Sequence, residues 1–483
     1  MLNETSPIDS RARVAIDLGA ESCRVSLLRW RGDEPEISEV HRIPNAPVVR
    51  DGSHRWPLGH ILAGLEEGLR KAAEVAGENI ASIAVDGWAV DYVRMDEDGK
   101  PLYDPFCYRD ERTIATKEKA DVILPPSEAF ERTGAQPLRI NTLYQLLADD
   151  PDVLHARWIC LPEYVLHWLG GPLIAEYTNA THTGLVDPKT GAWARGVLDA
   201  LGLPIEAAPR IVAPGTRLGL LEGPLCDLPP YQQTELIAPA CHDTASAIAG
   251  IPADLNTSAY ICSGTWSLVG TLVAQPITTD AALAARYTNQ GAATGGFCFH
   301  TNVNGMWLLK QCMETWSASG RTWTVPDLVL RASECTVPLT SINVDAEALL
   351  LAGNMPQKIN EELNRAGHQP IPDISGNEPM FARVIFESLA LRYAAALSDL
   401  QEMLGRKLDC VHVIGGASRN QLLAELATRH SGIPFDCGHP ESSTIGNFAV
   451  QLAASQSEDR PLTRTAVRKW ANNLCRTELQ PCT

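Results

Sequence analysis

The chain has 483 residues, of which 45% are hydrophobic and 20% are charged. One hydrophobic core stops growing at roughly 250–300 residues, so we expect at least two large domains, and the composition excludes a disordered chain. The net charge is −18, and no segment gathers Lys and Arg into a basic face. We therefore expect no nucleic acid partner.

The cysteines and the absence of long apolar runs indicate in which cellular compartment the protein is expected. The thirteen cysteines show no Cys-x-x-Cys pair and no Cys/His cluster at zinc spacing, so we expect reduced thiols and no structural metal site. Residues 1–13 are polar, and no run approaches the ~18 apolar residues of a membrane span. The sequence predicts a cytoplasmic protein without a membrane partner, and it leaves the oligomeric state open.

The first structured segment, residues 13–28, is an apolar run, a glycine turn at Gly19 and a second apolar run. This pattern predicts a strand, a tight loop and a strand. The same arrangement returns at residues 259–272, with its turn at Gly264. The offset between the two glycines is 245 residues, half of the chain.

Each of these units is followed by a helix that leads into a strand with a glycine turn. In the first unit the helix is expected over residues 61–76 and the strand over 81–87; in the second they are expected over 386–404 and 411–416. Such units recur in many α/β proteins. Their repetition in the same order favours a duplicated α/β domain with a cleft between the copies.

The segments between these units are less regular. Asp98-Gly99 predicts a hairpin turn, residues 204–230 predict loops with short strands, and residues 326–379 predict a helical, turn-rich insertion. We place the domain join near residues 250–255. This division gives an N-terminal domain over residues 1–250 and a C-terminal domain over residues 251–483.

Two glycine loops that face one cleft can bring backbone N–H groups close to phosphate oxygens, although each is also an ordinary hairpin turn. Asp17 ends the first strand, where a carboxylate can hold Mg²⁺ or can simply begin the turn. The chain lacks Gly-x-x-x-x-Gly-Lys-Ser/Thr and Gly-x-Gly-x-x-Gly. P-loop, Rossmann and protein-kinase folds are therefore disfavoured.

A second segment that can carry chemistry is Cys241-His242-Asp243-Thr244, just before an Ala-rich stretch. One interpretation is a helix cap, in which Asp243 or Thr244 accepts hydrogen bonds from free N–H groups. Another is a general base at the domain junction that takes a proton from a substrate hydroxyl. A thiol nucleophile formed by the Cys-His pair is a third interpretation, which is weaker because adjacent residues seldom orient one another.

Taken together, nine short segments resemble the FGGY carbohydrate kinases, and among them the rhamnulokinases most. They follow the family order and span nearly the whole chain: residues 15–20, 85–92, 108–110, 141–146, 176–181, 242–246, 263–268, 307–309 and 414–416. The resemblance implies an α/β fold of two duplicated, actin-like (ribonuclease-H-like) domains that close over ATP and a sugar.

The resemblance also implies roles for single residues. Asp243 matches the base that deprotonates the sugar hydroxyl, and Asp17 matches the metal-linked Asp of the first loop. Sugar-contacting positions fall on Ala89, His242, Asp243, Thr244 and Asn302. Nucleotide-contacting positions fall on Ala20, Glu21, Ser22, Cys23, Arg24, Thr265, Lys310 and Gly416.

Four of these positions depart from the family pattern. Ala89 replaces a sugar-contacting Gly and adds a methyl group to the pocket, while Glu21 and Cys23 stand where small residues are usual. Glu21 would repel phosphates unless it faces a metal or solvent. Lys310 replaces a Gln and could add positive charge on the nucleotide side.

The sequence thus predicts an ATP-dependent kinase that uses Mg²⁺ and phosphorylates the C1 hydroxyl of a ketose, with L-rhamnulose as the first candidate. L-fuculose, a xylulose or a ribulose are alternative acceptors. A nucleotide-dependent switch of the actin or heat-shock type, acting on a protein partner, is the alternative from another class. Asp243 and the polar pocket near Trp88 and Asn302 favour the kinase.

Overall fold

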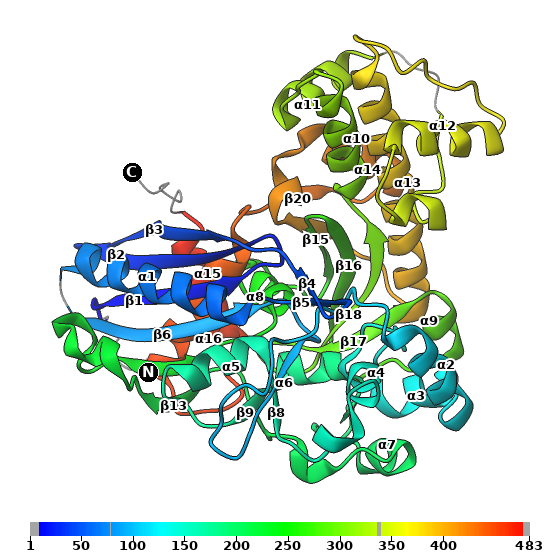
Figure 1. Cartoon of the computed structure of the whole chain (residues 1–483). Helices are drawn as coiled ribbons and strands as arrows, with labels where there is room; N and C mark the ends of the chain where they lie inside the picture. The colour runs from blue at the N-terminus through cyan, green and yellow to red at the C-terminus, as the bar shows by residue number, and fades with distance from the viewer. Residues whose placement is uncertain (1–8, 78, 336–339, 477–483) are drawn as a thin grey trace.

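A computed structural model describes residues 9–77, 79–335 and 340–476, which form two α/β halves, each built on a six-stranded sheet (Figure 1). Within these ranges no helix is both long enough and apolar enough to span a membrane. The twelve cysteines in these ranges are all free thiols, whereas Cys482 lies outside the described residues.

The sheet of the first half has the strand order β13-β14-β6-β1-β2-β3. Strand β1 pairs antiparallel with β2 and parallel with β6, and β6 pairs parallel with β14. The strands are β1 (Ala12–Leu18), β2 (Ser22–Arg31), β3 (Glu34–Pro44), β6 (Ile80–Gly87), β13 (Thr216–Leu220) and β14 (Glu235–Ala238).

The sheet of the second half has the order β17-β18-β16-β15-β19-β20. Its central strand β15 pairs antiparallel with β16 and parallel with β19, as β1 does with β2 and β6. The strands are β15 (Ser258–Ser263), β16 (Trp266–Val273), β17 (Tyr287–Gly291), β18 (Phe297–Asn304), β19 (Cys410–Ile414) and β20 (Phe435–Cys437).

The predicted duplication is confirmed by the strand register. Ile16 pairs with Val25 on one side and Val85 on the other, and Ile261 pairs with Val269 and Val413 in the same way. The strand, tight loop and strand pattern therefore builds the same central unit twice. Two-stranded pairs join the remaining short strands: β4 (Val48–Arg50), β5 (Ser53–Arg55), β7 (Tyr92–Arg94), β8 (Trp158–Cys160), β9 (Ile174–Glu176), β10 (Val186–Asp187), β11 (Ala192–Trp193) and β12 (Arg210–Val212).

Helix α1 (Leu58–Ala76) covers the first sheet and begins and ends close to the predicted bounds. Its apolar stripe is buried, and Gly77 ends it in a left-handed conformation with φ of 64°. The predicted turn at Asp98-Gly99 is also confirmed, since Met95 and Pro101 pair antiparallel around it. The other helices of this half before the join are α2 (Thr113–Ile123), α3 (Pro126–Thr133), α4 (Thr142–Leu147), α5 (Leu161–Trp168), α6 (Tyr177–Ala180), α7 (Arg195–Leu201) and α8 (Asp243–Ala249).

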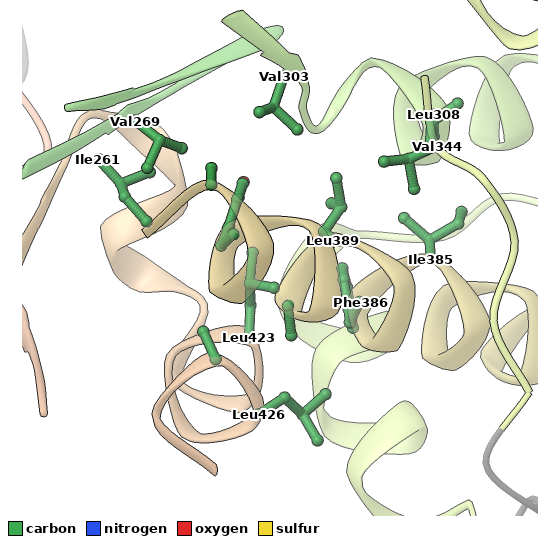
Figure 2. Packing of buried hydrophobic residues seen from close by; sticks show 14 of the residues in the cluster. Ile261, Val269, Val303, Leu308, Val344, Ile385, Phe386, Leu389, Leu423 and Leu426 are labelled. Carbon is green, nitrogen blue, oxygen red and sulfur yellow. The ribbon is translucent and has the colours of Figure 1, made fainter. Parts of the chain in front are cut away.

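The second half has its core around α13 (Glu378–Leu404). Figure 2 shows α13 in one buried cluster, in which Ile385 lies near Val344 and Leu308. The same cluster contains Phe386 and Leu389 of α13, the sheet residues Ile261 and Val269, and the helical residues Leu423 and Leu426. Each such side chain stabilises the fold by about 1.5–3 kcal/mol through burial. The helices of this half are α9 (Asp280–Ala284), α10 (Trp307–Ala318), α11 (Val325–Glu334), α12 (Met355–Arg365), α13 and α14 (Gln421–Ser431). Helices α11 and α12 occupy the predicted insertion, of which residues 336–339 lie outside the described ranges.

The last two helices, α15 (Ser442–Gln456) and α16 (Arg464–Leu474), return to the first sheet. Helix α15 lies against the first sheet (Figure 1), and its Ile445 and Phe448 share one buried cluster with Ala15 of β1 and Ala84 of β6. Helix α15 also crosses α8 so closely that a Cβ atom on Gly446 would lie 1.7 Å from the backbone oxygen of Ser246. This glycine allows α15 to cross closely over α8, the helix that begins with Asp243.

Candidate active site

Two carboxylates stand side by side at the ends of the central parallel strands of the first half. The register of β1 and β6 pairs Asp17 with Asp86, and both side chains are buried. Helix α15 supports both, since the Ser443 hydroxyl donates to Asp17 at 2.9 Å and the Asn447 amide donates to Asp86 at 2.7 Å. Burial raises the pKa of Asp86 well above its usual value, and the neighbouring charge of Asp17 raises it further.

The first glycine loop is held in one shape by its own backbone and by Asn45. The Asn45 amide donates to the Gly19 carbonyl at 3.0 Å, and the Asn45 N–H donates to the Glu21 carbonyl at 3.0 Å. A Cβ atom on Gly19 would lie 2.4 Å from the Ser22 backbone oxygen, so the turn has no room for a side chain there. Beyond the turn, Arg24 forms ion pairs with Asp17 and with Glu441 at the start of α15.

The structure places Asp243 as the first residue of α8, with its side chain 37% exposed. The preceding residue, His242, is the N-cap and its side chain makes no capping hydrogen bond, whereas the Asp243 carboxylate accepts a hydrogen bond from the Thr244 N–H, so the helix-cap interpretation of Asp243 stays a prediction beside the catalytic one. Burial raises the pKa of Asp243 to about 7, and the charge of Asp17 contributes to the shift. The Thr244 hydroxyl donates to the Asp243 carboxylate at 3.1 Å and opposes the shift.

A buried glutamate fixes the turn that precedes Asp243. The Cys241 N–H donates to the Glu176 carboxyl group at 2.8 Å, and the His242 N–H donates to the Thr178 hydroxyl at 3.2 Å. Burial raises the pKa of Glu176 to about 8. Cys241 is fully buried and its thiol pKa is raised well above the usual value by burial, which makes the thiol-nucleophile interpretation wrong.

The loop after β6 carries the predicted sugar position Ala89, which is buried, and a strained neighbour. Val90 has φ of 73°, a conformation that costs a β-branched residue roughly 1–3 kcal/mol. Its carbonyl accepts from the Thr142 hydroxyl at 2.8 Å and from the Gln145 amide at 3.2 Å. The next residue, Asp91, is buried and accepts from two tryptophan indoles, Trp56 at 2.5 Å and Trp88 at 3.0 Å. These hydrogen bonds stabilise the loop and offset the backbone strain at Val90.

The second glycine loop differs from the first in being open. A Cβ atom on Gly264 would meet no atom within 4 Å, and the same holds for Gly416 at the end of β19. The Gly264 carbonyl accepts from the Met306 N–H at 3.1 Å and the Thr265 carbonyl accepts from the Trp307 N–H at 3.2 Å. These bonds fix the loop to the start of α10, which carries Lys310.

Two of the departures from the family pattern contact each other. The Lys310 ammonium group lies 2.6 Å from the Glu21 carboxylate and joins α10 to the first glycine loop across the two halves. Glu21 therefore faces a cation and also solvent, since its side chain is 59% exposed, which agrees with the expectation. Cys23 is fully buried in the core of the first half, so its thiol does not reach the cleft.

Three of the predicted site residues, Asp17, Asp243 and Thr244, lie within interaction distance of one another or of a common neighbour. Asp17 and Asp243 interact electrostatically, and the thiol of Cys262, at the end of β15, interacts with Asp243 and Thr244 from the second half. Asn302 lies exposed on β18, which is separated from β15 by the strand β16. Among the described residues, no group of three or more His, Cys, Asp or Glu side chains is arranged to hold a metal ion.

Several residues of this site were missed in the sequence. Asp86 ends its strand as Asp17 does, so the same pattern could have identified it. Ser443, Asn447 and Glu441 could not have been assigned, because nothing local indicates that α15 returns to the first sheet. Gly446 within an otherwise Ala-rich helix is the one signal of a close helix crossing there.

Comparison with known proteins agrees with this architecture. The N-terminal domain of the FGGY family of carbohydrate kinases matches residues 12–250, and the C-terminal domain of the same family matches residues 259–455. A rhamnulokinase from Bacteroides thetaiotaomicron is 34% identical over 90% of this chain and 89% of its own length. One from Pectobacterium carotovorum is 36% identical over 91% and 88%.

Solved structures show the same fold at lower identity. A gluconate kinase from Lactobacillus acidophilus has a TM-score of 0.76 at 17% identity and covers 96% of this chain and 92% of that one. A ligand-bound xylulose kinase from the same organism has a TM-score of 0.75 at 18% identity, with the same coverage.

The chain belongs to the FGGY family of carbohydrate kinases. It is an ATP-dependent sugar kinase, and the alternative of a nucleotide-dependent switch acting on a protein partner is not retained. The fold class predicted from the sequence, two duplicated α/β domains of the actin type, is confirmed.

Proposed function

We propose that this kinase transfers the γ-phosphoryl group of ATP to the C1 hydroxyl of a ketose, and that L-rhamnulose is its acceptor. The observation that carries the proposal is Asp243, a carboxylate with a pKa of about 7 at the start of α8, whose side chain is 37% exposed. The identity of 34–36% to proteins named rhamnulokinases supports the choice of sugar.

In the proposed reaction Asp243 accepts the proton of the C1 hydroxyl while the sugar oxygen bonds to the γ-phosphorus and ADP leaves. A carboxylate whose pKa lies near the working pH is ionised often enough to act and basic enough to take the proton. His242, Thr244, Ala89 and Asn302 are the proposed sugar contacts. The Thr244 hydroxyl, 3.1 Å from the Asp243 carboxylate, orients the base.

Asp17 and Asp86 fit a Mg²⁺ site. Oδ1 of Asp86 is buried and finds no hydrogen-bond partner within residues 9–77, 79–335 and 340–476, and Asp17 stands opposite in register. Mg²⁺ usually takes one or two carboxylates together with phosphates and water, so two suffice without a larger cluster. When bound, Mg²⁺ neutralises charge on the transferred phosphoryl group. We assign Asp17 as the metal-linked residue.

The nucleotide is proposed to lie between the two glycine loops. Residues 20–24 of the first loop would contact phosphate oxygens: Ala20, Glu21, Ser22 and Arg24 border the turn, and Cys23 could contribute only its backbone, because its side chain is buried. Thr265, Lys310 and Gly416 would contact it from the second half. The open space around Gly264 and Gly416 supports a close approach of a ligand to the backbone there.

The proposal includes the division of the chain into an N-terminal domain, residues 1–250, and a C-terminal domain, residues 251–483, whose outermost residues lie outside the described ranges. It also includes a cytoplasmic location, where ATP is available, ATP and the ketose as partners, and no nucleic acid or membrane partner, with the oligomeric state left open. One observation supports considering a different acceptor sugar. The methyl group of the buried Ala89 narrows the predicted sugar pocket. L-fuculose, a xylulose and a ribulose therefore remain competing acceptors.

ADP release in the presence of Mg²⁺-ATP, measured with these four ketoses and with no sugar, tests the proposal. We expect L-rhamnulose to give the highest kcat/KM. A higher value for another ketose would correct the acceptor, and no stimulation by any ketose would overturn the proposed function.

A further inference from the structure

Three polar side chains form a buried cluster between the two halves, next to His242. His182 follows α6 in the first half, and Gln290 and His300 lie on the neighbouring strands β17 and β18 of the second half. Thr288 pairs with His300 and Gln290 pairs with Cys298, so Gln290 and His300 are diagonal neighbours on one face of the sheet. All three side chains are at least nine-tenths buried.

A hydrogen bond across the halves fixes the proton on His182. The Gln290 amide nitrogen lies 2.8 Å from Nδ1 of His182. Because an amide nitrogen only donates, Nδ1 accepts, and the neutral ring carries its proton on Nε2. Burial holds the pKa of His182 well below its usual value, so the ring is neutral.

His300 is arranged in the same way. Burial lowers its pKa to about 3, so this ring is neutral as well. The Tyr260 hydroxyl lies 2.9 Å from Nδ1 of His300, and donation there leaves the proton on Nε2.

Each member of the cluster keeps one unused polar atom. Nε2 of His182, Nε2 of His300 and Oε1 of Gln290 are buried and have no hydrogen-bond partner in the part of the chain that the structure describes. A buried polar group without a partner costs about 1–3 kcal/mol. Three of them in one cluster call for a common partner, either an ordered water or a ligand group.

The cluster adjoins two of the proposed sugar contacts. The rings of His182 and His242 lie 3.8 Å apart between centroids, and His242 lies 3.4 Å from Asp243. On the other side, Asn302 is two residues beyond His300 in β18, so the two side chains share a face of the sheet. The buried cluster therefore borders the proposed sugar site, between His242 of the first half and Asn302 of the second half.

We propose that His182, Gln290 and His300 form a subsite that binds one hydroxyl group of the acceptor sugar. Two N–H donors and one carbonyl acceptor complement a hydroxyl, which accepts two hydrogen bonds through its oxygen and donates one. The subsite rests on the proposed function and makes these residues determinants of sugar choice. Because its members come from both halves, the subsite is complete only where the two halves are in contact.

The test compares the preferred ketose with its monodeoxy analogues, each lacking one hydroxyl. A site built to hydrogen-bond a hydroxyl rejects the analogue that lacks it by far more than a hydrophobic pocket could, by up to roughly 10⁴–10⁵ in kcat/KM. We expect one analogue to lose at least about 10² in kcat/KM with the parent enzyme. In Gln290→Met and in His300→Phe, we expect kcat/KM for the unmodified ketose to fall. The ratio of this kcat/KM to that of the deoxy analogue should shrink to within about threefold.

His412→Phe is the matched control, since His412 is a buried histidine on β19 that pairs with Asp436. Its discrimination should equal that of the parent. An equal loss of kcat/KM for every sugar would show that the cluster holds a bound water. Unchanged discrimination between the ketose and its analogue, together with a lower melting temperature, would show that the cluster contributes only to stability. Either result overturns the subsite. If Gln290→Met does not fold, His300→Phe decides. An enzyme that no ketose stimulates would overturn both the proposed function and the subsite.

Discussion

The two central sheets share one topology but differ at the ends of their middle strands. In the first half, the paired positions that follow Ile16 and Val85 are Asp17 and Asp86. In the second half, the corresponding pair is Cys262 and Ile414. At these two paired positions the duplicated scaffold therefore carries carboxylates in the first half only. In the proposed assignment, the first half supplies the carboxylates for metal and proton, and the second half supplies Lys310 and the backbone near Gly264 for the nucleotide.

The two glycine loops differ in the same sense. A Cβ atom on Gly19 would lie 2.4 Å from the Ser22 backbone oxygen of the same turn. A Cβ atom on Gly264 would face open space. The first glycine is required by the fold of its loop. The second is available for a ligand.

Removal of the carboxylate at the end of β1 is the strongest test of this asymmetry. Asp17→Ala should reduce turnover by about 10²–10³, because several kcal/mol of charge stabilisation depend on the metal. Sugar binding should remain near that of the parent. Cys262→Ser, at the equivalent position of the second half, should leave the Mg²⁺ dependence of activity unchanged. The measurement is a Mg²⁺ titration of turnover, and equal titrations for Asp17→Ala and the parent would contradict the assignment.

The glycine loops give a paired prediction. Gly19→Ala should lower the free energy of unfolding by about 1–3 kcal/mol, because the new methyl group meets backbone that must move. Gly264→Ala should change it by less than about 0.5 kcal/mol and should raise the KM for ATP. Denaturant unfolding and ATP titrations measure the two effects. Equal stability losses in the two variants would show that the loops do not differ.

The pH dependence reports on Asp243. Its pKa is raised to about 7, first by burial, so the carboxyl group is protonated below that pH and ionised above it. Because the base must be ionised, kcat/KM should rise about tenfold between pH 6 and pH 8. The same shift stabilises the folded protein at low pH, and this contribution is lost as the pH rises through about 7. A flat profile of kcat/KM over this range would contradict the assignment.

The smallest effect concerns the ion pair between the halves. Glu21 and Lys310 are 59% and 42% exposed, so their coupling should be only about 0.2–1 kcal/mol and should weaken in salt. Glu21→Gln should tighten ATP binding by a few-fold, and Lys310→Gln should weaken it, since the phosphates compete with Glu21 for the lysine. A double-mutant cycle measures the coupling. Shifts of ATP affinity in the same direction in both variants would rule out this competition.

Local patterns were enough to predict the duplicated unit. Apolar runs around Gly19 and Gly264 mark the central hairpins, and Gly77 ends α1 where glycine is needed for a positive φ. Asp17 was singled out because it ends a predicted strand, and Asp243 because it stands just before a predicted helical stretch; their roles stay predictions. These features depend on a few neighbouring residues.

Long-range partners could not be predicted in this way. Ser443 reaches Asp17 from 426 residues away, and Lys310 reaches Glu21 from 289 residues away. His182 meets Gln290 only because the two halves are in contact there. Such pairs are set by how the halves and the last helices pack, and no local pattern carries that information.

The most direct test of the central claim is Asp243→Asn, with turnover and melting temperature measured on the same preparation. Asn keeps the shape and one acceptor oxygen but cannot take the proton from the sugar hydroxyl. Turnover should fall by roughly 10²–10⁴ while sugar and ATP still bind and the melting temperature stays near that of the parent. Full turnover in this variant would contradict the account of Asp243 as the catalytic base.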